Sequence, residues 1–303
     1  MRYSPIALFV YNRPAHTKKT IEALKRNSLA KYSDLIIFSD AAKNLSNEDS
    51  VNETRQYIKG IGGFKSLTIF ERGSNFGLAN SIIDGVTYVS SKYGKVIVLE
   101  DDLLTSPYFL NFMNAGLDAY ESHSDVISIH GYVYPISGLE NNFFLRGADC
   151  WGWATWQDRW KLFEPNGNKL LQQLIEKKLL KRFDFNGAYS FSDMLKAQIS
   201  GENNSWAIRW HASAFLLNKL TLYPRASLIK NIGNDGTGTH SGSTDIYSTD
   251  IYTLPINLAP ISVEESELAY KQFEKFFRRN KSFFLRGIRK LKWFYSYVFS
   301  LRI

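Results

Sequence analysis

Short apolar runs alternate with helix-like segments over the first hundred residues. Four runs are apolar at nearly every position and are predicted to be strands: 6–11, 35–38, 67–70 and 96–99. Three segments with helical spacing or polar helix composition separate them: 17–26, 48–61 and 79–89. Strands that are apolar on both faces and alternate with helices are typical of a parallel α/β sheet.

Polar residues follow every one of these predicted strands. They are Asn12 and Arg13, then Ser39 and Asp40, then Glu71, Arg72 and Asn75, and finally Glu100, Asp101 and Asp102. Ligands of open α/β sheets bind at the carboxyl ends of the strands. We therefore expect these side chains to converge on one crevice.

The three adjacent carboxylates of Glu100, Asp101 and Asp102 are the most informative of these groups. Neighbouring carboxylates in a half-buried crevice repel one another unless a cation lies among them. Oxygen ligands of this kind suit Mg²⁺ or Mn²⁺. The alternative is that the acids interact with the start of a helix that begins near Ser106, where the helix dipole favours negative charge.

The pattern changes after residue 105. We predict helices at 108–120, 170–183, 192–199 and 206–218, a strand at 126–130, and a long loop rich in Gly, Ser, Thr, Asn and Asp at 229–253. Four of the seven tryptophans fall within 151–160. Tryptophan faces can pack against sugar rings, but tryptophan also commonly fills a protein core, and both interpretations stay open here.

Length and composition limit the class of protein. The chain has 303 residues, 44% of them apolar, which suits one large globular domain or two small ones. The lone Cys150 excludes an intrachain disulfide framework and a cysteine-rich zinc site. The first apolar run is too short for a signal peptide, and no stretch approaches the roughly 18–20 apolar residues of a spanning helix. We therefore expect a cytoplasmic protein.

The formal net charge of +8 comes from the C-terminal segment. Residues 271–303 contain ten Lys or Arg against the single acid Glu274, so residues 1–270 carry −1. As a helix, this segment would align Phe273, Phe276, Phe277, Phe284, Ile288 and Leu291 on one face. That pattern favours a helix lying on an anionic membrane surface. Docking on a partner or on a second copy is the alternative, and nucleic acid is not expected because the body has no second basic patch.

Five short motifs in order resemble those of GT-A-fold glycosyltransferases, closest to the N-acetylglucosaminyltransferase I-like group and its bacterial relatives, over roughly residues 5–245. The motifs are YNRP at 11–14, FSD at 38–40, NFGLA at 75–79, VLEDDL at 98–103 and WGW at 151–153. The resemblance implies a GT-A, Rossmann-like α/β fold with a mixed, mainly parallel sheet flanked by helices, followed by the basic amphipathic tail.

The resemblance also implies roles for particular residues. Arg13, Asp40 and Asn75 would contact the nucleotide, and Asp101 the sugar or ribose. Asp102 and His240 would bind the metal that bridges the diphosphate, although His240 could equally be an ordinary surface histidine. Trp153 would lie near the sugar and acceptor.

One element of the family pattern is missing. The resembled group has a Trp-Asp pair that supplies the general base, whereas here Ala207 follows Trp206. Base candidates nearby in sequence are Asp235, Glu202 and Asp193. Asp193 is also a typical helix N-terminal charge and Asp235 a typical turn residue. If none of them acts, the mechanism is retaining.

These interpretations define an expected organisation. Residues 1–260 would form the catalytic domain, with a nucleotide-binding half at 1–105 and an acceptor-binding half at 106–260, and 261–303 would be a membrane-associating helical tail. The expected activity is transfer of a sugar from a nucleotide-diphosphate sugar, most simply a UDP-sugar, to a lipid-linked glycan of a bacterial surface polysaccharide, inverting, with Mn²⁺ or Mg²⁺, on the inner face of the membrane.

Two other classes remain open on the sequence. A sugar nucleotidyltransferase also uses a parallel α/β sheet and acidic metal ligands, but usually has a Gly-rich phosphate loop after the first strand. A non-catalytic carbohydrate-binding protein would tolerate the missing Trp-Asp carboxylate.

Overall fold

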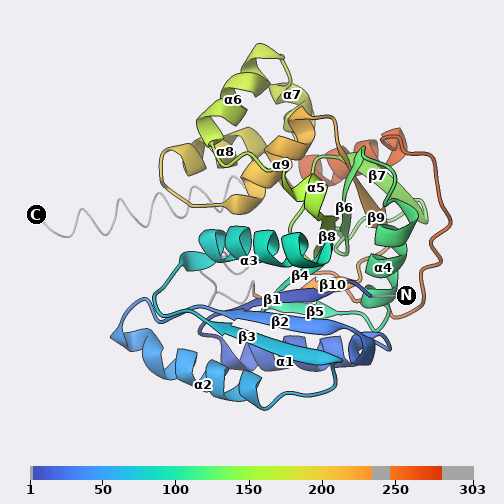
Figure 1. The fold of residues 1–303 in the computed structure, drawn as a ribbon. Coiled ribbons are helices and arrows are strands. Elements are labelled where there is room, and N and C mark those ends of the chain that lie inside the picture. Colours follow the sequence, from blue (N-terminus) through green and yellow to red (C-terminus); the bar gives the residue numbers. More distant parts are fainter. Residues whose placement is uncertain (1–2, 234–245, 282–303) are drawn as a thin grey trace, which may run out of the picture.

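A computed structural model describes residues 3–233 and 246–281. Its centre is an eight-stranded sheet in the order β3-β2-β1-β4-β8-β6-β9-β7 (Figure 1). The strands are β1 (Ile6–Val10), β2 (Asp34–Ser39), β3 (Ser66–Glu71), β4 (Lys95–Glu100), β6 (Val126–His130), β7 (Asn142–Arg146), β8 (Trp153–Trp156) and β9 (Leu220–Pro224). A second, two-stranded sheet pairs β5 (Leu103–Thr105) with β10 (Ile229–Asn231) antiparallel.

The large sheet is mixed and mainly parallel, as the sequence predicts. The four predicted strands are β1 to β4, and each pair among β3, β2, β1 and β4 is parallel. β8 pairs antiparallel with both β4 and β6, and β7 pairs antiparallel with β9. Strands β1 to β4 are therefore joined to the strands of the second half of the chain through β8, within one sheet.

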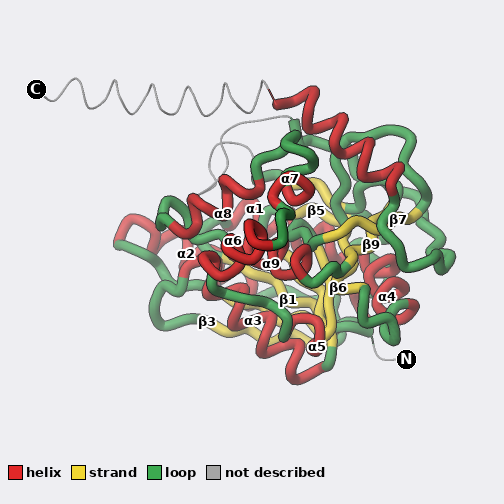
Figure 2. Tube along the Cα trace, turned by 90° about the horizontal axis from the view of Figure 1, so that it is seen from above, coloured by secondary structure: helices red, strands yellow, loops and turns green. Residues whose placement is uncertain are grey.

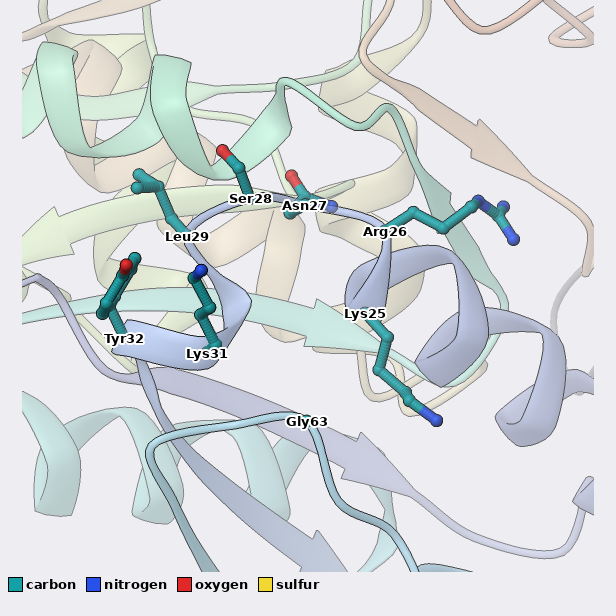
Figure 3. A pocket seen from close by; sticks show the side chains of 8 residues that line it. All are labelled: Lys25, Arg26, Asn27, Ser28, Leu29, Lys31, Tyr32 and Gly63. Atoms are coloured by element: carbon teal, nitrogen blue, oxygen red, sulfur yellow. The ribbon is translucent and has the colours of Figure 1, made fainter.

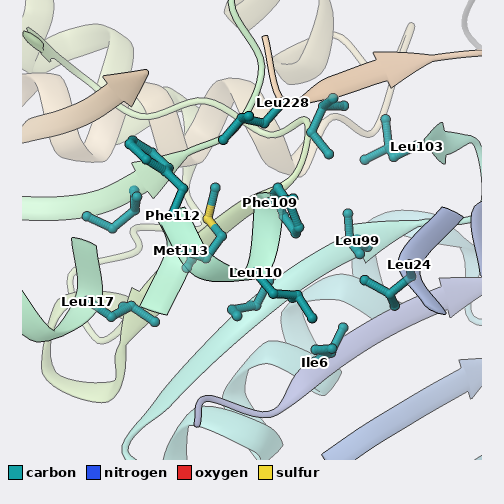
Figure 4. Close-up of a cluster of buried hydrophobic side chains, with 14 of the residues drawn as sticks. Ile6, Leu24, Leu99, Leu103, Phe109, Leu110, Phe112, Met113, Leu117 and Leu228 are labelled. Atoms are coloured by element: carbon teal, nitrogen blue, oxygen red, sulfur yellow. The ribbon is translucent and has the colours of Figure 1, made fainter. Parts of the chain in front are cut away.

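Helices cover both faces of the sheet. They are α1 (Pro14–Lys25), α2 (Glu48–Lys59), α3 (Gly77–Tyr93), α4 (Phe109–Ala119), α5 (Gln157–Trp160), α6 (Gly167–Glu176), α7 (Leu180–Phe183), α8 (Phe191–Ile199) and α9 (Trp206–Leu216), with 3₁₀ turns η1 (Ala30–Tyr32) and η2 (Leu45–Asn47). Alternation along the strands assigns the faces. Ile6 and Leu8 of β1 pack with α1, α2 and α4, whereas Ala7 and Phe9 pack with α3 and α9. Figure 4 shows the first of these two cores.

The α6–α9 segment forms a helical lobe with its own core. Leu170, Phe183, Leu195 and Phe215 are buried together there. Figure 2 shows α6, α8 and α9 gathered beside one another over the sheet. The continuous helix predicted at 170–183 is wrong: Lys178 has a φ of 56°, and this left-handed residue separates α6 from α7.

The described part of the C-terminal segment packs on the body. Residues 267–281 are helical. Phe273 and Phe277 are buried with Phe143 of β7 and Tyr223 of β9, and Phe276 packs against the same cluster. The expectation that Phe273 and Phe277 face a membrane is therefore wrong, because they are buried in the protein's own core, whereas Phe276 is partly buried beside Tyr134 and Phe277. Phe284, Ile288 and Leu291 lie outside the described residues.

Candidate functional site

The strand register brings the predicted polar residues to one edge of the sheet. Val10 is level with Ser39, Ser39 with Glu71, and Phe9 with Glu100. The residues that follow these positions leave the sheet on the same side, at the carboxyl ends of β1 to β4. Arg13, Asp40 and the acidic triplet thus lie at the same edge of the sheet.

Arg13 and Asp102 form an ion pair at this edge. Arg13, at the N-cap of α1, donates from Nη1 to Oδ2 of Asp102 at 2.9 Å, and its Nη2 lies 2.8 Å from Nε2 of His16. Both side chains of the ion pair are partly exposed, at 15% and 19%. The pair therefore presents a cation and an anion together to solvent.

Gly233, which follows β10, lies directly against this ion pair. The backbone N–H of Ile232 donates to the carbonyl of Asp102 at 2.9 Å. A Cβ placed on Gly233 would lie 2.0 Å from Oδ2 of Asp102 and 3.1 Å from Nη1 of Arg13. Only a glycine backbone fits so close to the carboxylate.

The acidic triplet carries negative charge that the protein itself only partly compensates. Burial, then the neighbouring Asp102, raises the pKa of Asp101 to about 7, although Arg13 and the Tyr11 amide lower it. Burial and the other two acids raise the pKa of Glu100 well above its ordinary value. Burial also raises the pKa of Asp102, against the opposing effect of Arg13. A cation at this edge would favour the ionised forms of all three.

A divalent metal fits this chemistry only if the protein supplies few of its ligands. Among residues 3–233 and 246–281, no three His, Cys, Asp or Glu side chains are placed to hold a metal ion. Mg²⁺ and similar ions are commonly bound through one or two carboxylates together with waters and substrate phosphates. Asp102 is partly exposed and could serve as such a ligand. His240, the other predicted ligand, lies outside the described residues.

Asp40 has a different environment from the one expected. We predict from sequence that it is exposed, but it is 7% exposed. Its carboxylate accepts hydrogen bonds from the backbone N–H groups of Phe76 at 2.8 Å and Gly77 at 2.9 Å, and from Nδ2 of Asn75 at 3.2 Å. Asp40 and Asn75 therefore fix the loop that begins α3, because helix N-termini leave backbone donors unsatisfied.

Trp153 is also placed differently from the prediction. It is fully buried in β8, and its ring stacks on Trp206 at 5.5 Å between centroids, with Trp160 and Trp210 nearby. The prediction that it faces sugar is therefore wrong for this structure, since no part of the ring is exposed. Trp151, two residues earlier, is partly exposed and contacts Tyr132 at 4.7 Å.

The described base candidates lie on the surface without a link to the triplet. Glu202 is exposed and accepts a hydrogen bond from the Ser200 hydroxyl at 2.9 Å. Asp193 is in the first turn of α8 and pairs with Lys196 at 3.0 Å, with 68% of its side chain exposed. The helix-charge interpretation thus describes Asp193 well. Asp235 lies outside the described residues.

A second polar group, centred on Asp149, lies beside the acidic triplet. It was not predicted from the sequence. β8 enters the sheet antiparallel to β4, with Trp153 level with Val98 and with His130. The residues just before β8, among them Asp149, therefore arrive at the edge where β4 and β6 end. Burial raises the pKa of the Cys150 thiol, and the negative charges of Asp149, Glu100 and Asp102 raise it further. Cys150 is therefore within electrostatic reach of both Asp149 and the acidic triplet.

A pocket of about 440 Å³ lies elsewhere on the molecule (Figure 3). It is lined by Lys25, Arg26, Asn27, Ser28, Leu29, Lys31, Tyr32 and Gly63. These residues adjoin the C-terminal end of α1, whereas Arg13 and Asp102 lie at its N-terminal end. The pocket is thus separate from the candidate site.

Comparisons with known proteins give distant likenesses. No protein-family profile and no curated protein matches the sequence. Among solved structures, the mannosyltransferase PcManGT from Pyrobaculum calidifontis, in complex with GDP-Man and Mn²⁺, matches at 14% identity and a TM-score of 0.32, over 44% of this chain and 36% of that one. Residues 1–349 of S. aureus TarS match at 15% and 0.31, over 48% and 41%.

A UDP-glucose pyrophosphorylase complexed with UDP-glucose matches at 11% identity and a TM-score of 0.39, over 74% of this chain and 91% of that one. The chain spans well under half the length of the two transferase structures. Likenesses this weak carry no functional argument, so the function is argued from the site.

Proposed function

We propose that this chain is a glycosyltransferase that moves a sugar from a nucleotide-diphosphate sugar to a glycan acceptor, with Mn²⁺ or Mg²⁺ and with inversion. The observation that carries the proposal is the Arg13–Asp102 ion pair at the carboxyl edge of β1 and β4, with the buried Asp101 behind it. It combines a group for phosphate oxygens with a group for a metal, at the edge where α/β sheets bind ligands.

The chemistry of sugar transfer explains why such a pair is needed. The bond between the anomeric carbon and the diphosphate breaks, and the leaving group gains negative charge. Arg13 can bind a phosphate oxygen and stabilise that charge. Asp102 would hold the divalent ion, with His240 as the second proposed ligand, and the bound ion supplies further positive charge at the diphosphate. Asp101 would orient the sugar or ribose.

The connection after β1 favours this reaction over sugar nucleotidyl transfer. β1 ends at Val10 and α1 begins at Pro14, so only three residues, including Arg13, lie between them. A nucleotidyltransferase would use a longer glycine-rich loop here to surround a triphosphate. The Arg13 guanidinium instead lies against Asp102, the proposed metal ligand.

The acceptor class and the location are part of the same proposal. We propose a lipid-linked glycan of a bacterial surface polysaccharide as the acceptor, with the chain held at the inner face of the membrane by its basic C-terminal residues. Lys271, Lys275 and Arg279 are exposed on the helix that covers the body. Among the described residues, no helix is both long enough and apolar enough to cross a bilayer.

Calorimetric titration of the protein with UDP and with GDP, each with and without MnCl₂, tests the proposal. We expect metal-dependent binding of one of them, and loss of that binding in Asp102→Asn. The matched control is Asp118→Asn, which removes an exposed carboxylate that pairs with Lys95 at the start of β4. If neither nucleotide binds the wild-type chain with the metal, the proposed function is wrong.

A further inference from the structure

The side chain of His130, at the end of β6, is buried and forms no hydrogen bond within residues 3–233 and 246–281. It is fully buried, and neither ring nitrogen has a hydrogen-bond partner among the described residues. Its Nε2 lies 3.7 Å from Oδ2 of Asp149, which is too long for a hydrogen bond. Buried polar groups are nearly always satisfied, so an unsatisfied imidazole aimed at a carboxylate requires a functional explanation.

Asp149 is held by a backbone hydrogen bond, lies beside His130 and Tyr223, and is still partly exposed. Its Oδ1 accepts a hydrogen bond from the backbone N–H of Cys150 at 3.0 Å, and Oδ2 faces His130. The side chain is 31% exposed, so a ligand can reach it. This combination of a fixed carboxylate, a neutral imidazole behind it and access to solvent is suited to accepting a proton.

Aromatic side chains from distant segments surround this carboxylate. Trp151 contacts Tyr132 at 4.7 Å and Tyr247 at 5.8 Å, and Tyr134 contacts Tyr132 at 5.3 Å. The Tyr189 and Tyr247 hydroxyls lie 3.3 Å apart. Partly exposed aromatic faces beside a carboxylate are what a saccharide needs, because its C–H face packs on rings while its hydroxyls bind polar groups.

The position of Asp149 relative to the donor half follows from the sheet. Extending the β4–β8 register places Trp151 level with Glu100, at the same edge as the Arg13–Asp102 pair. Asp149 precedes this point by two residues, on the β6 and β9 side. A sugar held through a diphosphate at Asp102 would thus lie at the sheet edge that also carries Asp149.

On this basis, and resting on the proposed function, we propose that Asp149 is the general base of the transfer and that the aromatic group around it receives a saccharide acceptor. An acceptor hydroxyl gives its proton to Asp149, and its oxygen forms a bond to the anomeric carbon. The bond from that carbon to the diphosphate breaks, and the nucleoside diphosphate leaves with the electron pair. Asp149 ends protonated, and His130 acts as a positioning residue.

The test compares Asp149→Asn with the wild-type chain, using UDP-glucose and GDP-mannose with Mn²⁺ as donors and either water or a panel of p-nitrophenyl hexosides as acceptors. Asparagine keeps the shape and the hydrogen bond from Cys150 but cannot take up a proton. We expect nucleotide affinity to stay within about twofold, and release of nucleoside diphosphate to fall by about 10²–10⁴-fold.

A split between kcat and KM adds a readout that a structural role would not move. We expect Asp149→Asn to lower kcat while the KM for the donor stays within about twofold, because the donor contacts proposed at Arg13 and Asp102 are unchanged. His130→Phe should lower kcat less than Asp149→Asn does, because its ring positions the carboxylate without taking up the proton.

Asp125→Asn is the matched control, because it removes an exposed carboxylate, paired with Lys219, just before β6. The proposal is overturned if Asp149→Asn turns over with the wild-type kcat. It is also overturned if the wild-type chain binds nucleotide and metal but transfers sugar to neither water nor hexosides. Failure to bind any nucleotide, in contrast, is a failure of the proposed function.

Discussion

Oδ2 of Asp102 lies 2.9 Å from Nη1 of Arg13, and the backbone of Gly233 closes over both groups. Three segments that are far apart in sequence therefore meet at one carboxylate. A ligand bound at Oδ2 would lie beside the guanidinium and the glycine backbone, which makes the site sensitive to small changes in all three segments.

Gly233→Ala is expected to displace the Asp102 carboxylate. The added Cβ would lie 2.0 Å from Oδ2, which is far inside van der Waals contact. We expect metal-dependent nucleotide affinity, measured by calorimetry, to fall at least tenfold. Gly73→Ala is the control, since no atom of the described residues lies within 4 Å of its added Cβ. Equal affinity in both variants would mean that the Asp102 carboxylate does not bind the ligand.

Asp101→Asn is expected to stabilise the protein at high pH. The folded-state pKa of Asp101 is about 7, against an ordinary 3.8, so the folded chain holds this proton more tightly than the unfolded chain. The Asp101 carboxyl therefore does not lower the free energy of unfolding below about pH 4. Its ionisation lowers that free energy progressively as the pH rises toward 7. The upper limit of the gain in Asp101→Asn at pH 8 is about 4 kcal/mol.

Urea unfolding at pH 4.5 and pH 8 measures this difference. The asparagine oxygen still accepts the hydrogen bond from the Tyr11 amide, so the comparison isolates the charge. Asp125→Asn, with 71% of its side chain exposed, should change stability by less than about 0.5 kcal/mol at either pH. A gain for Asp101→Asn that is the same at both pH values would contradict the assigned ionisation.

Asp40→Ala is expected to destabilise the fold. Two backbone N–H groups at the start of α3 lose their acceptor, which costs about 1–3 kcal/mol. Asp49→Ala removes an exposed acid from the first turn of α2 and should cost about 0.5 kcal/mol or less. Thermal unfolding and nucleotide titration separate the two interpretations of Asp40. A variant with unchanged stability and lost affinity would show that Asp40 acts through the nucleotide instead.

Removal of the C-terminal helix is expected to unfold or strongly destabilise the chain. A protein ending at residue 266 loses Ala269, Tyr270, Phe273 and Phe277 from a buried cluster. The milder variant Phe277→Ala should cost about 3–5 kcal/mol, because the side chain is 1% exposed. Lys271→Ala, on the exposed face, should stay within about 0.5 kcal/mol.

A chain ending at Lys281 separates this packing from membrane binding. It keeps every described contact of the helix, so we expect wild-type stability in denaturant. Flotation with anionic liposomes should show binding by the full chain and loss of binding in the shortened one, with salt weakening the former. If the shortened chain still floats with liposomes, residues 282–303 are not the anchor.

The sequence predicts the first half of the fold well because its signals there are local. The run 35–38, for example, is apolar on both faces, and β2 extends it by one residue at each end. β8 was not predicted, because its residues Trp153 and Trp156 follow no strand-like run and are identified only by their partners. Asp149 was missed for the same reason: its position depends on the antiparallel entry of β8, which no local pattern indicates.

The apolar face of the C-terminal helix shows a different limit of prediction from sequence. The predicted helix is present over residues 267–281, and the rest of the predicted face lies outside the described residues. An amphipathic pattern predicts that the apolar face of a helix is covered, but it does not predict which surface covers that face. Here Phe143 and Tyr223 of the sheet cover Phe273, where lipid was expected.

The hydrogen bonds between β4 and β8 limit how this protein can move. They join the strand that carries the acidic triplet to the strand that follows Asp149, so the two halves of the candidate site cannot swing apart about a hinge as separate lobes do. Binding of a ligand would leave the sheet in place and move only side chains and connecting segments. Its affinity would then depend on how well those groups are arranged beforehand, and rapid exchange of ligands would not require a slow domain rotation.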